Sequence, residues 1–379
     1  MTLAEAFRMT YDVRPSGVWS APGRVNLIGE HTDYNDGFVL PFAIAARTSV
    51  AAAPRDDDLL RMRSLQQPSG DASVTLDALE PGRPEGWASY VAGVVWAVRE
   101  QGHEVRGADL VVDGRVPLGG GLSSSHALEV AVAIAVNDLF GLGLDTDALA
   151  DLTRLAENKF VGAPTGLMDQ LALLRGQAGH ALFLDTRSLH AEQVPLDPAA
   201  DGYALVVIDT KVHHSLGDGA YADRRAACER AAAQLGLGSL RDLALDGLAQ
   251  RLAGLDDELC RRARHVVTEN ARVPAAVDAL RSRDWAELGS LMNASHTSLR
   301  DDYEVSCDEL DVAVEAARRA GAVAARMTGG GFGGSAIALA PARRMPALRS
   351  EVVSAFAAAG WPTPGVFEVA PSDGARRDH

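Results

Sequence analysis

The stretch from Pro22 to Gly37 reads PGRVNLIGEHTDYNDG and packs a cation, an imidazole and three carboxylates between glycines. The apolar residues Val25, Leu27 and Ile28 lie within it, so a buried strand would hold the following polar groups rigidly. A rigid set of donors and acceptors is what a hydroxyl-rich ligand requires. These residues therefore favour a polyol or sugar site over a solvated loop.

A second stretch, Pro117 to Ser125, places three glycines before three serines at the start of an apolar helical pattern. Glycines let a backbone approach a ligand closely, and free amides at a helix N-terminus attract anions. Serines also cap helices, but three glycines followed by three serines exceed what capping needs. We expect a phosphate-binding loop, although the chain contains no P-loop of the GxxxxGK[ST] type.

A third stretch, Gly329 to Gly334, satisfies the letter pattern GxGxxG. A dinucleotide fingerprint must open a helix, whereas the residues that follow, Ser335 to Ala340, form a short apolar run that ends at Pro341. The context therefore predicts a glycine turn between two strands. Such a turn either lines a ligand site with backbone or is simply a tight hairpin.

A fourth stretch, Gly162 to Gln170, carries Asp169 after a glycine turn, just beyond a helix whose flank bears Glu157. A lone aspartate in this position is usually an N-cap. Together, however, a phosphate loop, a sugar-like polar cluster, a metal carboxylate and a base are the parts that phosphoryl transfer needs.

These motifs resemble those of a known family. Gly23 to Pro41 resembles the galactokinase signature, and Pro117 to Ser125 resembles the phosphate loop of the superfamily of galactokinase, homoserine kinase, mevalonate kinase and phosphomevalonate kinase. Thr328 to Gly334 resembles the third motif of that superfamily, and the three motifs occur in family order. The resemblance implies an α+β fold of two domains with the active site between them.

The resemblance also implies roles for individual residues. Asp169 would accept the proton of the anomeric C1 hydroxyl of the sugar, and Arg24 would keep Asp169 ionised and neutralise developing charge. Sugar contacts would come from Glu30, His31, Thr32, Asp33, Asp36, Gly166 and Tyr221, with Glu30, His31 and Asp33 hydrogen-bonding the hydroxyls. ATP would be held by Gly119, Gly120, Gly121, Leu122, Ser123, Ser124 and Ser125, with Trp87 near the adenine. Ser125 and Glu157 would hold Mg²⁺.

The implied activity is ATP-dependent phosphorylation of D-galactose to α-D-galactose 1-phosphate. Two alternatives stay open: a kinase for a related sugar such as N-acetylgalactosamine or L-arabinose, and a non-catalytic regulator that binds galactose and ATP. Two residues depart from the usual family pattern, since His126 replaces alanine and Thr165 replaces cysteine. We expect His126 to have no essential catalytic role and to affect mainly the ATP Michaelis constant at mildly acidic pH.

The spacing of apolar residues along the chain predicts the helices and strands that could position these residues. Helices are predicted over 87–99, 123–140 and 146–160, where apolar residues recur at helical spacing. Extended segments are predicted over 18–20, 25–28, 38–45 and 203–209. A polar stretch near residue 200 suggests an N-terminal α+β domain over 1–200 and a C-terminal one over 201–379. We expect the tail 371–379 to be frayed.

The composition of the 379 residues is that of a globular protein, with 47% hydrophobic and 23% charged residues. The net charge of −15 opposes nonspecific binding to nucleic acid or to anionic membranes. The three cysteines form no CxxC pair, and no apolar stretch is long enough for a membrane span. We expect a cytoplasmic monomer with small-molecule substrates and no nucleic-acid or membrane partner.

Overall fold

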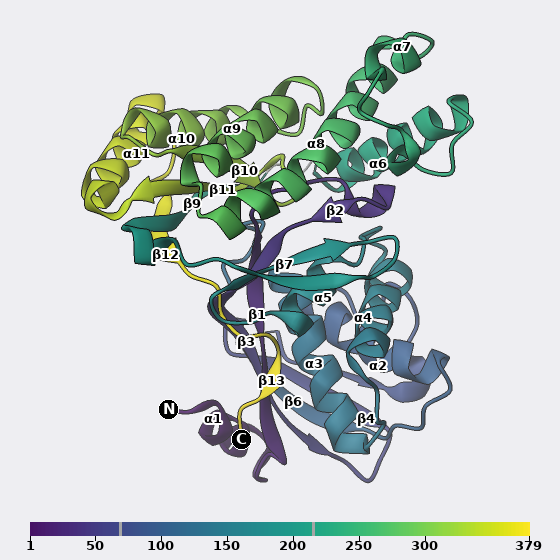
Figure 1. Ribbon diagram of the computed structural model, residues 1–379. Helices are drawn as coiled ribbons and strands as arrows, with labels where there is room; N and C mark the ends of the chain where they lie inside the picture. The colour runs from purple at the N-terminus through teal and green to yellow at the C-terminus, as the bar shows by residue number, and fades with distance from the viewer. Residues whose placement is uncertain (68–69, 214–216) are drawn as a thin grey trace.

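The computed structural model describes residues 1–67, 70–213 and 217–379, and it divides into two halves built on separate sheets (Figure 1). The first sheet has the strand order β13-β1-β3-β6-β4-β5, and its pairs are antiparallel except for β4 with β6. Its strands are β1 (Gly17–Asn26), β3 (Pro41–Pro54), β4 (Leu59–Ser64), β5 (Ala72–Thr75), β6 (Ala108–Gly114) and β13 (Arg376–Arg377).

Helices cover both faces of this sheet, but unequally. One face carries α2 (Trp87–Glu100), α3 (Ser124–Phe140), α4 (Thr146–Leu155) and α5 (Met168–Arg175) (Figure 1). The central helix α3 has apolar residues on almost every side, as expected of a helix that is enclosed by neighbouring helices and the sheet. The short α1 (Leu3–Tyr11) packs on the opposite face through Phe7 against Ala51 and Val111.

The second half is an antiparallel sheet in the order β10-β11-β9-β12, covered by helices (Figure 1). Alternate residues of its inner strand β9 enter different cores: Leu205 and Val207 join the large core shared with the first half, and Val206 and Ile208 join the core beneath the C-terminal helices. The strands are β9 (Tyr203–His213), β10 (Ala324–Thr328), β11 (Gly333–Pro341) and β12 (Gly365–Val369). The helices are α6 (Gly217–Gln234), α7 (Leu248–Leu252), α8 (Asp257–Ser282), α9 (Trp285–Asp301), α10 (Asp308–Arg319) and α11 (Met345–Ala359).

Two further features place the site. A third small sheet, β2-β7-β8, is formed by β2 (Phe38–Val39), β7 (His180–Asp185) and β8 (Ala191–Pro195). The predicted helix 146–160 continues past α4 as a π-helical turn over Ala156–Val161. A π-helical turn inside a helix often marks a functional position, and this one carries Glu157.

Strand pairing corrects two expectations from the sequence. The segments 18–20 and 25–28 do not form two strands, because β1 runs without a break from Gly17 to Asn26 with a bulge between Pro22 and Arg24. The tail is not frayed. Its residues 376 and 377 pair with β1, Ser372 N donates to Ala43 O, and Ala375 N donates to Leu173 O.

The C-terminal tail therefore belongs with the first sheet rather than with the second half of the chain, and both termini lie near each other at one end of that sheet (Figure 1). The boundary proposed at residue 200 falls between β8 and β9, where the chain passes from one half to the other. In the described part of the chain, no helix has the length and apolar character needed to cross a membrane.

Candidate functional site

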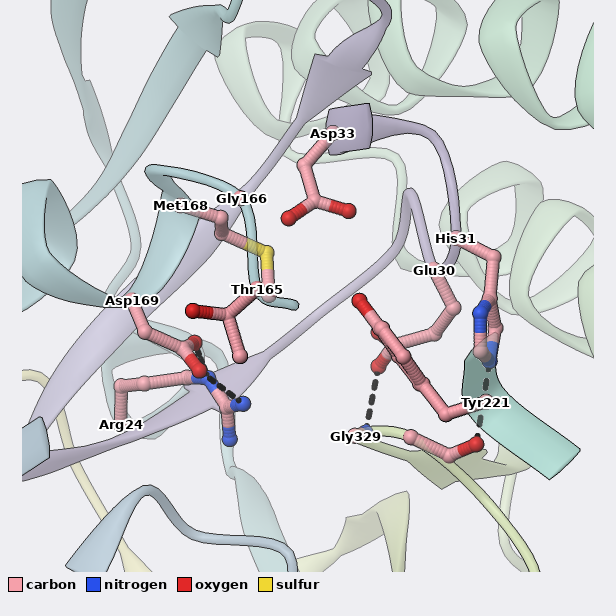
Figure 2. A pocket seen from close by; sticks show the side chains of 11 residues that line it. Arg24, Glu30, His31, Asp33, Thr165, Gly166, Met168, Asp169, Tyr221 and Gly329 are labelled. Atoms are coloured by element: carbon pink, nitrogen blue, oxygen red, sulfur yellow. Dashed lines mark hydrogen bonds and ion pairs between the residues drawn. The ribbon is translucent and has the colours of Figure 1, made fainter. Parts of the chain in front are cut away.

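A polar cavity of about 180 Å³ lies where segments of the two halves meet. Figure 2 shows Arg24 and Asp169 together on one side, Glu30, His31 and Tyr221 on another, and Asp33 above them. The lining residues are Arg24, Glu30, His31, Asp33, Thr165, Gly166, Met168, Asp169, Tyr221, Gly329 and Gly330. One cavity thus brings together the stretch 22–37, the Asp169 stretch and the glycine turn. At their extremes these segments are more than 300 positions apart in the chain.

Arg24 and Asp169 form a bidentate ion pair at the wall of the cavity. Arg24 Nη2 donates to Asp169 Oδ2 at 2.9 Å, and Arg24 Nε contacts the other carboxylate oxygen. Burial alone would raise the pKa of Asp169, but Arg24 and then His126 outweigh that effect and hold the pKa below its usual value. Asp169 is therefore an ionised carboxylate at neutral pH, able to accept a hydrogen bond from a ligand hydroxyl.

The same arginine connects this pair to the glycine-rich loop at 119–125. Arg24 Nη1 donates to Gly121 O at 2.5 Å, and the backbone of Arg24 donates to Leu122 O at 3.1 Å. The loop ends at Ser123, whose left-handed backbone (φ 61°) leads into α3 without a side-chain cap. The Ser123 side chain therefore does not cap α3, and the first amides of the helix are not satisfied by it. An anion is a suitable partner for such amides.

The glycine turn after β10 closes against this loop, as the sequence predicted for a turn between two strands. A side chain at Gly329 would approach the backbone of Gly121, and one at Gly334 would meet the backbone of Gly120. Glycine is required in both places because two backbones pass at contact distance. The turn thus lines the cavity with backbone and packs against the loop 119–125 of the other half.

Glu30 is a buried carboxylate whose Oε1 is held by the protein. Its Oε1 accepts hydrogen bonds from Gly329 N at 2.7 Å and from Thr328 Oγ1 at 3.2 Å, and it lies 3.5 Å from Nη1 of Arg326. Burial raises the pKa of Glu30 despite the nearby arginines. Sequence reasoning missed Arg326, which is fully buried in β10. The residues just before it, 320–325, are small and uncharged, so they give no sign that an ion pair forms here.

The carboxylate of Asp33 lies directly beside Gly166 at the cavity (Figure 2). A methyl group at position 166 would collide with the Asp33 carboxylate, so the glycine makes room for that carboxylate. Burial first, and the neighbouring Asp169 second, raise the pKa of Asp33 to about 6. A ligand that donates hydrogen bonds to Asp33 would relieve this desolvation.

Another acidic group, Glu157, lies beside the first turn of α3. Glu157 is 3% exposed, its Oε2 accepts from Thr165 Oγ1 at 2.6 Å, and His126 Nε2 lies 2.8 Å away in an ion-pair contact. His126 Nδ1 lies 3.3 Å from Ser125 Oγ and 3.4 Å from Asp169 Oδ2. Burial would lower the pKa of His126, but Glu157 and Asp169 together raise it. The two residues that depart from the family pattern, His126 and Thr165, thus both contact Glu157.

Two predicted sugar contacts, Thr32 and Asp36, and the predicted adenine neighbour Trp87 lie outside the cavity, as do the predicted nucleotide and metal residues 119–125 and Glu157. Thr32 Oγ1 donates to the backbone carbonyls of Gly29 and Phe38, so it shapes the turn. Asp36 is half exposed and its carboxylate lies 3.4 Å from Arg187 Nη2. Trp87 Nε1 donates to Gly70 O, and its ring packs against the core.

A second cavity of about 460 Å³ adjoins the first and shares Thr165, Tyr221 and Gly330 with it. Tyr90, one helical turn beyond Trp87 in α2, lines this second cavity. Sequence reasoning missed Met168, which lines the first cavity. Its position next to Asp169 in the chain is the signal that could have identified it.

Comparison with known proteins agrees with these features. Three family models match: the galactokinase galactose-binding signature over residues 5–54, the GHMP kinases N-terminal domain over 89–177 and the GHMP kinases C-terminal domain over 276–358. A galactokinase of Streptomyces coelicolor is 52% identical, covering 99% of this chain and 98% of its own. A galactokinase of Roseiflexus is 42% identical, with 99% and 96% covered.

Solved structures give the same result. The galactokinase of Lactococcus lactis complexed with galactose superposes with a TM-score of 0.93 at 35% identity, covering 99% of this chain and 98% of its own. A mevalonate kinase of Methanococcus jannaschii superposes with a TM-score of 0.67 at 15% identity, covering 95% and 100% respectively, which shows a shared fold.

Proposed function

The chain belongs to the galactokinase family and phosphorylates galactose with ATP, and we propose that it transfers the γ-phosphoryl group to the C1 hydroxyl, giving α-D-galactose 1-phosphate and ADP. The observation that carries this proposal is the Arg24–Asp169 pair, which lies on the wall of a small polar cavity while Arg24 also contacts the phosphate loop. In this pair, Asp169 would supply the base for the sugar hydroxyl, and Arg24 would supply a positive charge near the phosphates.

Galactose would occupy the 180 Å³ cavity, with its hydroxyls donating to Glu30 and to Asp33. The C1 oxygen attacks the γ-phosphorus, the bond from that phosphorus to the β–γ bridging oxygen breaks, and ADP leaves. The hydroxyl proton passes to Asp169. Because Arg24 lowers the proton affinity of Asp169, the proton moves late or together with phosphoryl transfer rather than before it.

The phosphates of ATP would lie against the backbone of Gly119 to Ser125 and the N-terminus of α3. The chain lacks a P-loop lysine, and its amides, helix terminus and Arg24 supply positive potential instead. A loose transition state depends on such positioning and charge neutralisation more than on covalent chemistry.

Mg²⁺ fits the donor set beside this loop. Glu157 offers a buried carboxylate and Ser125 a hydroxyl, and both are the hard oxygen donors that Mg²⁺ prefers alongside phosphates and water. Among the described residues no cluster of three or more acidic, histidine or cysteine side chains forms a cation site. Because the chain supplies so few oxygen donors here, Mg²⁺ would bind together with the nucleotide, whose phosphates supply further oxygens. When bound, it would neutralise charge on the phosphates.

Compartment and assembly also belong to the proposal. The three cysteines are free, which agrees with a reducing compartment, so we place the chain in the cytoplasm. We propose a monomer acting on small molecules, without a nucleic-acid partner, in line with the net charge of −15.

An ADP-release assay over a sugar panel tests the function. Galactose with Mg²⁺ and ATP should give ADP, and N-acetylgalactosamine and L-arabinose should give far less; removal of Mg²⁺ should abolish turnover. ADP from another sugar but not from galactose would overturn the substrate. Galactose binding without turnover of any sugar would identify a regulator instead.

A further inference from the structure

Both ring nitrogens of His31 are engaged by the protein. Nδ1 lies 2.7 Å from the hydroxyl of Tyr34, and Nε2 lies 3.1 Å from the carbonyl oxygen of Gly330. The Tyr34 hydroxyl in turn lies 2.8 Å from that of Tyr303. His31 therefore has no ring nitrogen left for a sugar hydroxyl, contrary to the expectation from sequence, although its ring lines the cavity.

The direction of these hydrogen bonds follows from what each atom can do. A carbonyl oxygen only accepts, so Nε2 of His31 must carry a hydrogen. Burial lowers the pKa of His31 to about 3, so the ring is neutral and Nδ1 must accept. The Tyr34 hydroxyl donates its single hydrogen to Nδ1, and its oxygen then accepts from the Tyr303 hydroxyl. At the far end, the buried thiol of Cys228 lies 3.1 Å from Tyr303 Oη and can donate to it.

The acceptor at the near end of this chain belongs to the sugar site. Gly330 lines the cavity from the second half of the molecule, whereas His31 follows β1 in the first half. The ring of Tyr221, another lining residue, packs 5.3 Å from the His31 ring and lies over Gly330. Fixing the His31 N–H thus fixes the backbone of the glycine turn next to the sugar.

We propose that Tyr34 and Tyr303 are positioning residues of the sugar site. Through a one-directional chain of hydrogen bonds they hold His31 as the Nε2–H tautomer, and His31 then ties the glycine turn of one half to the sugar-binding loop of the other. This inference rests on the proposed sugar site, because it concerns residues that position one wall of that cavity.

The first test is independent of catalysis. Nitrogen-15 NMR of the full chain with labelled histidine should show His31 with a protonated Nε2 and an unprotonated, hydrogen-bonded Nδ1, the signals being assigned by their loss in His31→Asn. In Tyr34→Phe the Nδ1 signal should move toward the position of a free ring nitrogen. In Tyr303→Phe it should move less, because Tyr34 still donates. A protonated Nδ1 in the unaltered chain would overturn the proposal, whether or not the chain phosphorylates galactose.

The second test is kinetic. Tyr34→Phe should raise the Michaelis constant for galactose about 5- to 20-fold, the effect of losing one buried hydrogen bond, with much smaller changes in kcat and in the constant for ATP. Tyr303→Phe should raise it less.

Tyr11→Phe is the matched control, because the Tyr11 hydroxyl also donates a hydrogen bond, in its case to the backbone carbonyl of Leu110, but lies on α1 away from the cavity. Equal galactose constants in Tyr34→Phe and Tyr11→Phe would overturn the positioning role. Should Tyr34→Phe fail to fold, the NMR of the unaltered chain and the kinetics of Tyr303→Phe decide the question. Absence of turnover in the unaltered chain would instead be a failure of the proposed function.

Discussion

At the scale of single residues, the proposed base Asp169 is a carboxylate whose charge is set by its partners. Arg24 and His126 both lie within ion-pair distance of Asp169, while the carboxylate faces the cavity. An environment of this kind makes a weak base that is always ionised at neutral pH. The chemistry then depends on where the hydroxyl is placed as much as on proton affinity.

Asp169→Asn tests the base. The amide keeps the shape but cannot take the proton, so kcat should fall by at least about 100-fold, in the range of general-base contributions, while galactose affinity changes little. Rates and calorimetric binding measured on the same preparation check this. A rate within threefold of the unaltered chain would remove Asp169 from the role of base.

His126→Ala tests a residue that the sequence suggested was dispensable. His126 contacts Glu157 and Asp169, yet it adds no oxygen for a metal. We expect kcat at neutral pH to stay within about threefold, and half-saturating Mg²⁺ to fall about two- to fivefold, because Glu157 loses a cationic partner that competes with the metal. A magnesium titration at fixed ATP measures both. A fall in kcat of more than tenfold would place His126 in the catalytic machinery.

Asp33→Asn should stabilise the ligand-free protein at neutral pH. The pKa of Asp33 is about 6 in the folded state against 3.8 unfolded, so the folded state binds more protons between these values and stability falls as pH rises through this window. Because Asp33 is partly exposed, the asparagine variant should gain on the order of 1–2 kcal/mol at pH 8 and less at pH 5. Thermal unfolding at both pH values checks the sign, and an equal effect at pH 5 and 8 would contradict it.

At the scale of elements, the site depends on loops that enter from different strands and helices. The loop before α5 passes so close to the turn after β1 that Gly166 and Asp33 leave no room for a methyl group. The bulge in β1 lies between Pro22 and Arg24, immediately before the residue that pairs with Asp169. Bulges commonly redirect a side chain next to an active site, and this one precedes Arg24.

Gly166→Ala should displace the Asp33 carboxylate while leaving the fold intact, because the methyl group meets a side-chain end that can rotate. We expect kcat/KM for galactose to fall about 10- to 100-fold, as misplacement by about an ångström typically does. Gly254→Ala is the control, since that glycine has no heavy atom within 4 Å of an added Cβ. If both alanine variants kept full activity, the close approach of Gly166 and Asp33 would be without consequence.

At the scale of the whole molecule, the two halves are held by shared structure rather than by a linker. The large core contains residues of the first sheet together with Leu205 and Val207 of β9. The tail returns to the first sheet and binds the end of α5, where Ala375 N donates to Leu173 O and Gly374 N to Gly176 O. The helix that begins at Met168, next to Asp169, is therefore anchored at its end by the C-terminus of the chain.

Removal of the tail after Ala370 should destabilise the protein. It deletes the pairing of β13 with β1 and the backbone bonds to Ala43, Leu173 and Gly176, so we expect a loss of several kcal/mol and a fall in Tm on the order of 10 °C. Arg376→Ala is the control, because its side chain makes an exposed pair with Asp378. An unchanged Tm in the shortened chain would mean that the tail contributes nothing to stability.

The sequence by itself determined the local parts of this protein. Apolar periodicity placed the central helix over 123–140 and the glycine turn between two strands, because both depend on residues close together in the chain. The resemblance of three motifs indicated the family, and through it Arg24, Glu30, Asp33, Asp169 and Tyr221, all of which line the cavity.

The tertiary structure decided which groups are still free to bind a ligand. Sequence could not show that Tyr34 and Gly330 engage both ring nitrogens of His31, or that Thr32 and Asp36 do not line the cavity. Nor could it show that the last residues complete the first sheet. Except for Thr32, these outcomes depend on partners far along the chain, such as Gly330 for His31 and β1 for the tail. The direction in which such a side chain points is fixed only when those partners pack.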